Sequence, residues 1–302
     1  MTTFSGSTPD ASPLPRTGFL LLAVVVAGWG LTWPSVKIAV SEIDPWTFRA
    51  VTVCGGGILL LLIAAAFKLP LRLPAGTWRP LVVSSVFNIV GWHLFSAFGI
   101  LHMGSGHAAL IAYSMPLWAA IAGVYLLGER LTARRCAVMA LGMVGIVILL
   151  PDGGKLSDGS FMGVGLMLCA AISWAIGVVH FKSIRWQAPI VVIAAWQHLI
   201  GSLPMAVIVA GLGFQDLTQI SSNAVAAMLF LIIGPIALCT VAWYRVVILF
   251  PTRVSSLGSL LVPVVGVVSG SLILGEPLGL RELTAMALIC GAVALELLHR
   301  PA

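Results

Sequence analysis

Residues 105–131 read SGHAALIAYSMPLWAAIAGVYLLGERL, and residues 252–278 read TRVSSLGSLLVPVVGVVSGSLILGEPL. The two stretches align without a gap at an offset of 147 residues, and seven of their 27 positions are identical. The shared positions spell Pro–x6–Gly–x3–Leu-Gly-Glu-x-Leu, a pattern that chance rarely produces even between apolar segments. The sequence therefore predicts an internal duplication.

The composition of the chain is that of a membrane protein. Of the 302 residues, 60% are hydrophobic and 9% are charged, and the mean hydropathy is +1.09. A soluble domain carries about 25% charged residues, so this chain has too few charges to cover a water-exposed surface. Apolar stretches of about 20 residues, long enough to cross the ~30 Å hydrocarbon core, separate the charged clusters. Because a backbone in lipid must satisfy its own hydrogen bonds, these stretches are expected to be helices.

The first 16 residues, MTTFSGSTPDASPLPR, differ from the rest in being polar and rich in Ser, Thr and Pro. Residues 1–16 are expected to form a disordered cytoplasmic tail. The apolar run after Arg16 is longer than 20 residues and contains no small-residue cleavage site. It is therefore interpreted as a retained helix rather than as a signal peptide.

Ten apolar runs, bounded by turn-like breaks, predict an all-α integral membrane protein with ten transmembrane helices. Their expected ranges are 17–38, 45–67, 79–100, 104–127, 133–150, 160–182, 189–210, 223–246, 252–274 and 281–298. With the N-terminus inside, alternate crossings place 12 of the 16 basic residues inside and 4 outside. Since Lys and Arg favour the cytoplasmic side, both termini are expected in the cytoplasm. The expected location is a bacterial inner membrane. The net charge of +6 then reflects topology, and no nucleic-acid surface is expected.

The ten spans divide into two five-helix repeats, at residues 17–150 and 160–299. A second match supports this division, since Trp29 falls on Trp174 at an offset of 145. Because each repeat has an odd number of spans, the second must insert upside down relative to the first. Inverted repeats around a central cavity are typical of secondary transporters. A duplicated scaffold without a transport role is the alternative.

The chain resembles the EamA-type branch of the drug/metabolite transporter superfamily. The resemblance rests on the two Pro…Leu-Gly-Glu-x-Leu segments, 116–131 and 263–278, and on GWGLTWPSVK at 28–37. It implies a ten-helix bundle in which helices 1–4 and 6–9 surround a central cavity and helices 5 and 10 are peripheral. The segment IAYSMPLW at 111–118 is also similar to the fourth helix of YddG-type exporters of aromatic amino acids.

No Asp or Glu lies in the middle of any predicted span. A charge in mid-membrane is costly and usually marks an ion path. Its absence favours a neutral or zwitterionic substrate, and it argues against proton coupling through a carboxylate. Glu129 and Glu276, at matching ends of the fourth and ninth spans, are expected to bond the amides of the helices that follow, with a gating role as the alternative. Lys37 and Arg49 flank the outer mouth. Attraction of a substrate carboxylate is one interpretation of them, and extension to lipid headgroups is the favoured alternative.

A substrate site is predicted where aromatic and amide side chains face the bundle interior. Asn88, Trp92 and Phe95 recur at i, i+4 and i+7 and so share one helix face. Tyr113 and Trp174 add rings from two further helices, which suits stacking on a ligand held by a few polar groups. The expected substrate-binding residues are Asn88, Trp92, His93, Phe95, Tyr113, Met115, Trp174, Cys239 and Trp243.

Histidines and prolines complete the set of candidate functional residues. His93, His107, His180 and His198 lie within spans, where each is expected to bond a neighbouring carbonyl; a proton relay through His93 or His180 is the alternative. Pro116 and Pro263 occupy equivalent positions in the two repeats. They are the candidate hinges of alternating access, or else static kinks.

Several classes of chemistry lack their motifs. The five cysteines form no CxxC or Cys/His cluster, so no metal, redox site or cofactor is expected. No GxxxxGK[ST] loop is present, and no Asp/Asp, Ser/His or HExxH pair supports an enzyme. A monomeric secondary transporter that exports aromatic or other amphipathic amino acids, or related metabolites, is therefore expected. A proton-coupled drug/metabolite antiporter with His93 or His180 as relay is the alternative.

Overall fold

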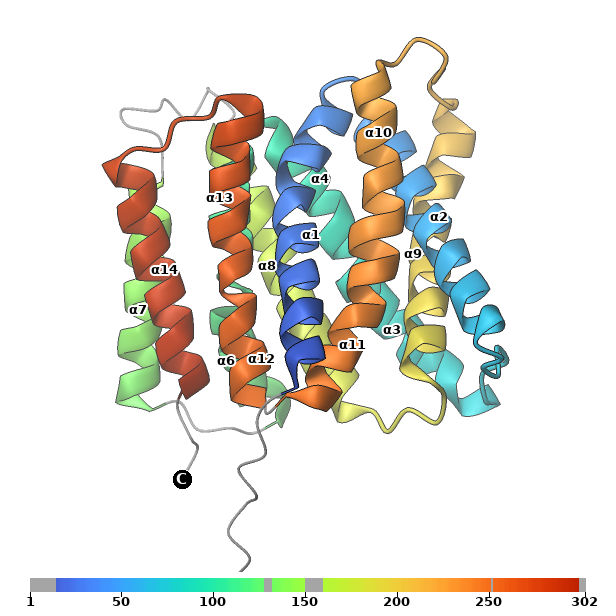
Figure 1. Ribbon diagram of the computed structural model, residues 1–302, viewed down its shortest axis with the longest axis horizontal. Helices are drawn as coiled ribbons and strands as arrows, with labels where there is room; N and C mark the ends of the chain where they lie inside the picture. The colour runs from blue at the N-terminus through green and yellow to red at the C-terminus, as the bar shows by residue number, and fades with distance from the viewer. Residues whose placement is uncertain (1–14, 128–131, 150–159, 251, 299–302) are drawn as a thin grey trace, which may run out of the picture.

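The computed structural model describes residues 15–127, 132–149, 160–250 and 252–298, and over these residues its regular structure is helical. The first half contains α1 (Arg16–Val40), α2 (Pro45–Ala66), η1 (Ala75–Thr77), α3 (Trp78–Ser85), η2 (Val86–Gly91), α4 (Trp92–Leu101), α5 (Ser105–Ala112), α6 (Met115–Leu127) and α7 (Ala133–Ile148). The second half contains α8 (Ser160–Ser183), α9 (Ile190–Leu212), α10 (Ser222–Leu231), η4 (Ile232–Cys239), α11 (Thr240–Leu249), α12 (Thr252–Ser259), α13 (Leu261–Leu274) and α14 (Leu280–Leu298). Figure 1 shows them packed as one bundle.

Seven helical segments of the described chain are long and apolar enough to cross a membrane. They are Arg16–Val40, Pro45–Ala66, Ala75–Leu101, Ser105–Tyr125, Phe161–Ser183, Ile190–Leu212 and Ser222–Leu249. The remaining predicted ranges hold α7, α13 and α14; the first and second of these include apolar stretches of 10–17 residues, Cys136–Ile148 and Leu261–Leu274. The prediction of an all-helical, multi-pass membrane protein is confirmed. The count of ten crossings stays a prediction.

Helices are interrupted at matching places in the two halves. The third and eighth predicted spans each contain a π-helical stretch, η2 and η4. The fourth span breaks between α5 and α6, and the ninth between α12 and α13. Each of these breaks lies just before a proline, Pro116 or Pro263, which cannot donate to the carbonyl four residues earlier and clashes with it. The repeated sequence therefore produces a repeated break in the backbone.

The two halves run in opposite directions through the bundle. In Figure 1, α1 rises from the lower end, whereas α8, the first helix of the second half, descends from the upper end. The contacts between halves are exchanged in the same sense: α1 packs on α13 and α11, and α8 packs on α6 and α4. Helix α2 pairs with its counterpart α9, and α5 with α13. These directions and contacts are consistent with the inverted repeats that the sequence predicts, which stay a prediction.

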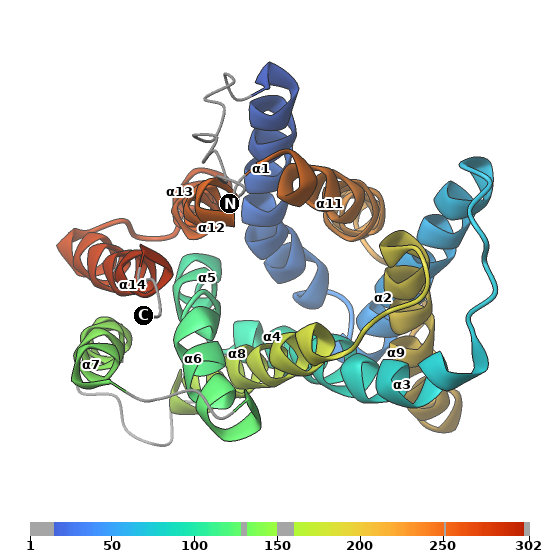
Figure 2. The ribbon, with the colours of Figure 1, turned by 90° about the horizontal axis from the view of Figure 1, so that it is seen from below.

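The last helices of the halves, α7 and α14, pack on each other. Figure 2 shows this pair at one edge of the bundle, as the resemblance implies for the fifth and tenth helices. The main core connects the halves, since buried residues of α1, α5 and α13 such as Val36, Ala109 and Val267 belong to one cluster. No half buries its apolar surface without the other.

Because the halves run in opposite directions, we predict that the starts of α7 and α14 lie on opposite sides of the membrane. Ala133→Cys, at the start of α7, and Leu278→Cys, just before α14, lie at opposite ends of the bundle. In a variant without the native cysteines, a membrane-impermeant maleimide should label Ala133→Cys only from the cytoplasmic side and Leu278→Cys only from the other side. Labelling of both positions from one side of oriented vesicles would contradict the inverted arrangement.

Candidate functional site

Three tryptophans from three helices meet inside the bundle. The ring centroids of Trp92 on α4 and Trp33 on α1 lie 6.2 Å apart in an edge-on arrangement. The ring centroid of Trp174 on α8 lies 6.3 Å from that of Trp92. We call Trp33, Trp92 and Trp174 the tryptophan row. Because α1 and α4 belong to the first half and α8 to the second, the row connects the two repeats.

A second aromatic pair continues this surface toward η4 and α11. The rings of Trp29 and Trp243 lie 5.4 Å apart, and Trp29 Nε1 donates to the carbonyl oxygen of Pro235 at 3.3 Å. The thiol of the buried Cys239 lies 3.7 Å from the carbonyl oxygen of Val24, which accepts its weak hydrogen bond. The first helix of one half thus contacts the π-helical stretch of the other.

Tyr113 and Met115 lie at the break between α5 and α6. Tyr113 is buried in the main core, and Met115 packs against the same cluster, as do Trp92 and Trp243. Six of the nine predicted substrate-binding residues thus pack in the interior of the bundle: Trp92, Tyr113, Met115, Trp174, Cys239 and Trp243. That they form one substrate site stays a prediction.

Asn88 lies against α8, the helix that carries Trp174, whereas Phe95 is partly exposed. The Asn88 Oδ1 atom is buried without a hydrogen-bond partner, and it lies so close to Gly177 of α8 that a Cβ there would collide with it. Phe95 is 37% exposed. The shared face assumed 3.6 residues per turn, but the π-helical η2 begins before Asn88 and turns more slowly, which rotates Phe95 relative to Asn88.

The π-helical η2 is held by the opposite half. Ser173 on α8 donates its hydroxyl hydrogen to the carbonyl oxygen of Phe87 at 2.9 Å. A wider turn displaces backbone groups from their usual partners, so a side-chain donor is needed. In the first half, Trp29 bonds the carbonyl oxygen of Pro235 in η4. Positions 28 and 29 match positions 173 and 174 at an offset of 145. Each half thus uses one residue of this matched pair to bond the π-helical stretch of the other half.

The histidines have different surroundings. His180 Nδ1 lies 2.9 Å from the hydroxyl of Ser84. The Nδ1 atom of His93 is buried without a partner, and the ring centroid of His93 lies 6.1 Å from that of His198 on α9. The expected bond from His93 or His180 to a carbonyl is not found; His198 makes such a bond, to Ala194 at 2.7 Å.

Arg49 is the clearest departure from expectation at the outer mouth. The alternative that it extends to lipid headgroups is wrong, since the residue is only 4% exposed. Its Nε donates to the carbonyl oxygen of His93 at 2.9 Å, and its Nη2 to the hydroxyl of Ser96 at 3.3 Å. The side chain is therefore held between α2 and α4 inside the protein.

Lys37 also turns inward. Its Nζ donates to three carbonyl oxygens at the end of α4, those of Ile100 (2.7 Å), Leu101 (3.3 Å) and Met103 (2.9 Å). The last carbonyls of a helix lack backbone partners and carry partial negative charge. An ammonium group placed there satisfies three of them at once.

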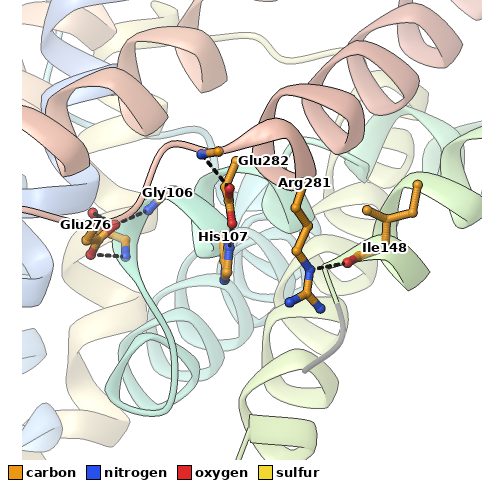
Figure 3. A network of polar contacts seen from close by, with 8 residues as sticks. Gly106, His107, Ile148, Glu276, Arg281 and Glu282 are labelled. Atoms are coloured by element: carbon orange, nitrogen blue, oxygen red, sulfur yellow. Dashed lines mark hydrogen bonds and ion pairs between the residues drawn. The ribbon is translucent and has the colours of Figure 1, made fainter. Parts of the chain in front are cut away.

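Glu276 binds the start of α5, on the other side of the short connection that follows α4. Its carboxylate accepts hydrogen bonds from the amides of Ser105 (2.6 Å) and Gly106 (2.9 Å) and from the Ser105 hydroxyl (3.0 Å); Figure 3 shows this contact. The expectation that Glu276 bonds the helix that follows it is wrong, because it binds the N-terminus of α5 in the opposite half. The matching prediction for Glu129 falls outside the described residues.

Further polar contacts join the halves at this upper end. Glu282 accepts a bond from the amide of Gly279 at 2.8 Å and pairs with His107 Nε2 at 3.1 Å. In Figure 3, Arg281 Nε donates to the carbonyl oxygen of Ile148 at 2.6 Å. The carboxylate that the sequence predicted for the start of α14 is therefore supplied by Glu282.

Glu42, in the turn between α1 and α2, binds the loop that precedes α10. It accepts bonds from the amide and the hydroxyl of Ser221 at 2.7 and 2.6 Å. These hydrogen bonds stabilise the carboxylate and lower the pKa of Glu42 below its usual value. Together, Lys37, Glu276, Glu282 and Glu42 form the upper latch. The three carboxylates bond the opposite half, and Lys37 ties α1 to the end of α4 beside them.

A pocket of about 840 Å³ opens beside the latch, between the ends of α1, α10 and α13. Its lining includes Ser35, Lys37, Asn223, Phe230 and Glu276. None of the predicted substrate-binding residues lines it, and the polar groups of Lys37 and Glu276 are occupied by backbone partners. Over the described residues, no group of three or more His, Cys, Asp or Glu side chains could hold a metal ion.

Sequence reasoning left out Trp29, Trp33 and Lys37 from the predicted site. The match of Trp29 with Trp174 at an offset of 145 was a usable signal, because equivalent residues of two interlocked repeats approach the same interface. Lys37 could not be placed from sequence, since its partners lie 63 to 66 residues away.

Known proteins match the chain along most of its length. The model of the EamA-like transporter family matches twice, at residues 16–150 and 161–298. A relative from Salmonella typhimurium, described as a "probable amino-acid metabolite efflux pump", is 31% identical over 293 residues, which cover 91% of this chain and 92% of the relative. The uncharacterized transporter YvbV of Bacillus subtilis is 28% identical over 287 residues, covering 94% of this chain and 92% of YvbV.

A solved crystal structure supports the fold alone. It superposes with a TM-score of 0.65 at 22% sequence identity, and it covers 94% of this chain and 99% of that protein. The two family matches fall on the two halves that the duplicated segments predicted.

The latch makes a stability prediction. Glu276→Ala should lower the free energy of unfolding by roughly 1–3 kcal/mol, because it leaves the α5 amides without their charged acceptor. The thermal unfolding midpoint in detergent measures this. Asp216→Ala is the matched control, since that carboxylate bonds Thr218 of its own loop and should change the midpoint little. Equal midpoints for the two variants would contradict the assigned role of Glu276.

Proposed function

We propose that this chain, which belongs to the EamA-like transporter family, is a ten-span secondary transporter that exports amphipathic amino acids or related metabolites. The opposite directions of its two halves are the observation that carries the proposal. Like halves in opposite orientations can exchange conformations, which opens a central site to each side in turn. No energy source beyond the solute's own gradient is required for such a cycle.

The latch contacts hold the upper end of the bundle together, which bears on how that end opens during transport. Lys37 and Glu276 hold the upper ends of α1, α4, α5 and α13 together, and Glu42 holds α1 to the start of α10. A carrier must close one side before it opens the other, and these latch contacts are the ones that we expect to break when the upper end opens. We assign it to the periplasm, and the lower end, where α1 starts and α14 ends, to the cytoplasm.

The substrate class follows from the tryptophan row and from two relatives. Relatives from Salmonella typhimurium and Escherichia coli, the second 28% identical, are described as probable amino-acid metabolite efflux pumps. Rings from three helices offer flat apolar faces for an aromatic or branched side chain. The lack of an acidic residue in mid-span favours a solute without net positive charge.

Proton-coupled antiport is the second candidate, and one observation favours it. His93 Nδ1 is buried without a partner, which is the state of a ring that exchanges a proton during a cycle. His180 is a weaker relay, because Ser84 already binds its Nδ1 atom.

Flux through proteoliposomes tests the proposal. With no ATP and no ion gradient, preloaded phenylalanine or leucine should exchange with labelled solute outside, and empty liposomes should not do so. Flux that appears only under an imposed proton gradient, and that His93→Gln abolishes, would instead support antiport. Failure of every amino acid under both conditions would refute the proposed substrate class.

Trp92→Ala should reduce exchange by about tenfold or more, because the central ring of the row loses its stacking surface. The initial rate of labelled amino-acid exchange, normalised to the protein reconstituted, provides the measurement. Trp78→Ala is the control: Trp78 is 38% exposed and packs against Trp196, away from the row. Normal exchange by Trp92→Ala would refute the role of the tryptophan row, while Trp78→Ala should retain nearly all activity.

A further inference from the structure

Arg49 is a buried arginine that forms no ion pair with the described residues. It sits on the second turn of α2 with 4% of its surface exposed, and its guanidinium lies 4.6 Å from the ring centroid of Phe48. No carboxylate of the described residues forms an ion pair with it. An arginine side chain stays protonated in proteins, and an unpaired buried charge costs several kcal/mol. The described chain therefore places a permanent positive charge inside the bundle without its own counter-ion.

The guanidinium also has unused donors. It carries five N–H groups, and its hydrogen bonds to the described residues come from Nε and Nη2, to His93 and Ser96. The Nη1 group has no protein acceptor among them. A group that still offers donors after its protein contacts are made is suited to a ligand that brings acceptors.

The side chains nearest to Arg49 include two histidines. His93 contributes a buried Nδ1 without a partner, and the His198 ring stands 6.1 Å from the His93 ring. We call Arg49, His93 and His198 the basic cluster. It draws on α2, α4 and α9, so both halves contribute to it.

The duplication shows that the charge is not a common structural element. At offsets of 145 to 147, the positions equivalent to Arg49 are Ala194, Ala195 and Trp196. A cation required by the fold of each repeat would be expected in both halves, whereas a solute with one anionic group needs one cation. The cluster also adjoins the tryptophan row, since His93 follows Trp92 on α4.

We propose that the basic cluster binds the carboxylate of the transported solute, with Arg49 as the specificity-determining residue. The inference rests on the proposed function and narrows it to solutes that carry a free carboxylate beside an apolar or aromatic group. The guanidinium fork matches the two oxygens of a carboxylate, and the neighbouring row receives the side chain. Because Arg49 is buried in this state, the solute binds when α2 and α4 separate during the cycle.

Binding of matched ligands to the purified full-length protein tests the proposal. The probes are phenylalanine and phenylalaninamide, together with hydrocinnamate and hydrocinnamide, so that each pair differs in the carboxylate alone. Wild-type protein should bind each acid more tightly than its amide. Arg49→Met should weaken binding of the acids by roughly 30-fold or more while changing the amides little. Arg185→Met, which removes an exposed arginine, should keep the wild-type preference.

The outcomes separate the site from the function. Equal affinity of the wild-type protein for acid and amide would overturn the proposal even if Arg49→Met failed to fold. An unchanged acid preference in folded Arg49→Met would overturn it as well. Arg49→Lys keeps the charge without the fork and should retain part of the preference. If Arg49-dependent binding of hydrocinnamate occurs but no amino acid is exchanged, the site stands and amino-acid export fails. If amino acids are exchanged but the wild-type protein shows no preference for the acids, amino-acid export stands and the carboxylate site at Arg49 fails.

Discussion

The structure depends on one constraint: a backbone group exposed by a helix break inside a membrane must find a partner in protein, because lipid offers none. This chain breaks its helices repeatedly and meets the requirement with side chains, most of them from the opposite half. Lys37 covers carbonyls at the end of α4 within its own half, and Glu276 covers amides at the start of α5 in the other half. Ser173 bonds a carbonyl of η2, and Trp29 bonds one of η4. Most of the contacts that satisfy the breaks are thus also contacts that join the repeats.

This coupling has a consequence for motion. If the halves move relative to each other, they must exchange the partners of the broken helices, and an intermediate without partners would be costly. Such a requirement favours two discrete arrangements over a continuum, which is what a carrier with alternating access needs. The breaks before Pro116 and Pro263 lie at equivalent places in the two halves and are the proposed bending points of such a motion. The upper latch of Lys37 and Glu276 is then a removable lock rather than a permanent brace.

Sequence alone was sufficient for features that depend on local composition or on repetition. Hydropathy located the helical ranges, and the Pro…Leu-Gly-Glu segments located the duplication and the family. It failed where the partner is distant in the chain. Glu276 was assigned to the nearest helix start, but its partners lie 171 and 170 residues away. The face of Asn88 and Phe95 was lost because a π-helical stretch has no hydropathy signal. Arg49 looked like a headgroup anchor, since its distance from the predicted span end says nothing of the direction of its side chain.

The tryptophan row has a spacing that bears on how a solute would enter it. A flat ring placed between two others needs two van der Waals separations of about 3.5 Å, or about 7 Å in total. The centroids within the row are already 6.2 and 6.3 Å apart. The rings meet at interplanar angles of 78° and 54°, so an aromatic side chain could enter only if two of them rotate or move apart by about 3.5 Å. The solute ring would replace the ring contact that it interrupts, and the cost of opening also includes the polar contacts of the latch. An anionic group held at Arg49 would offset that cost, and a solute lacking either the ring or the carboxylate would offset less of it.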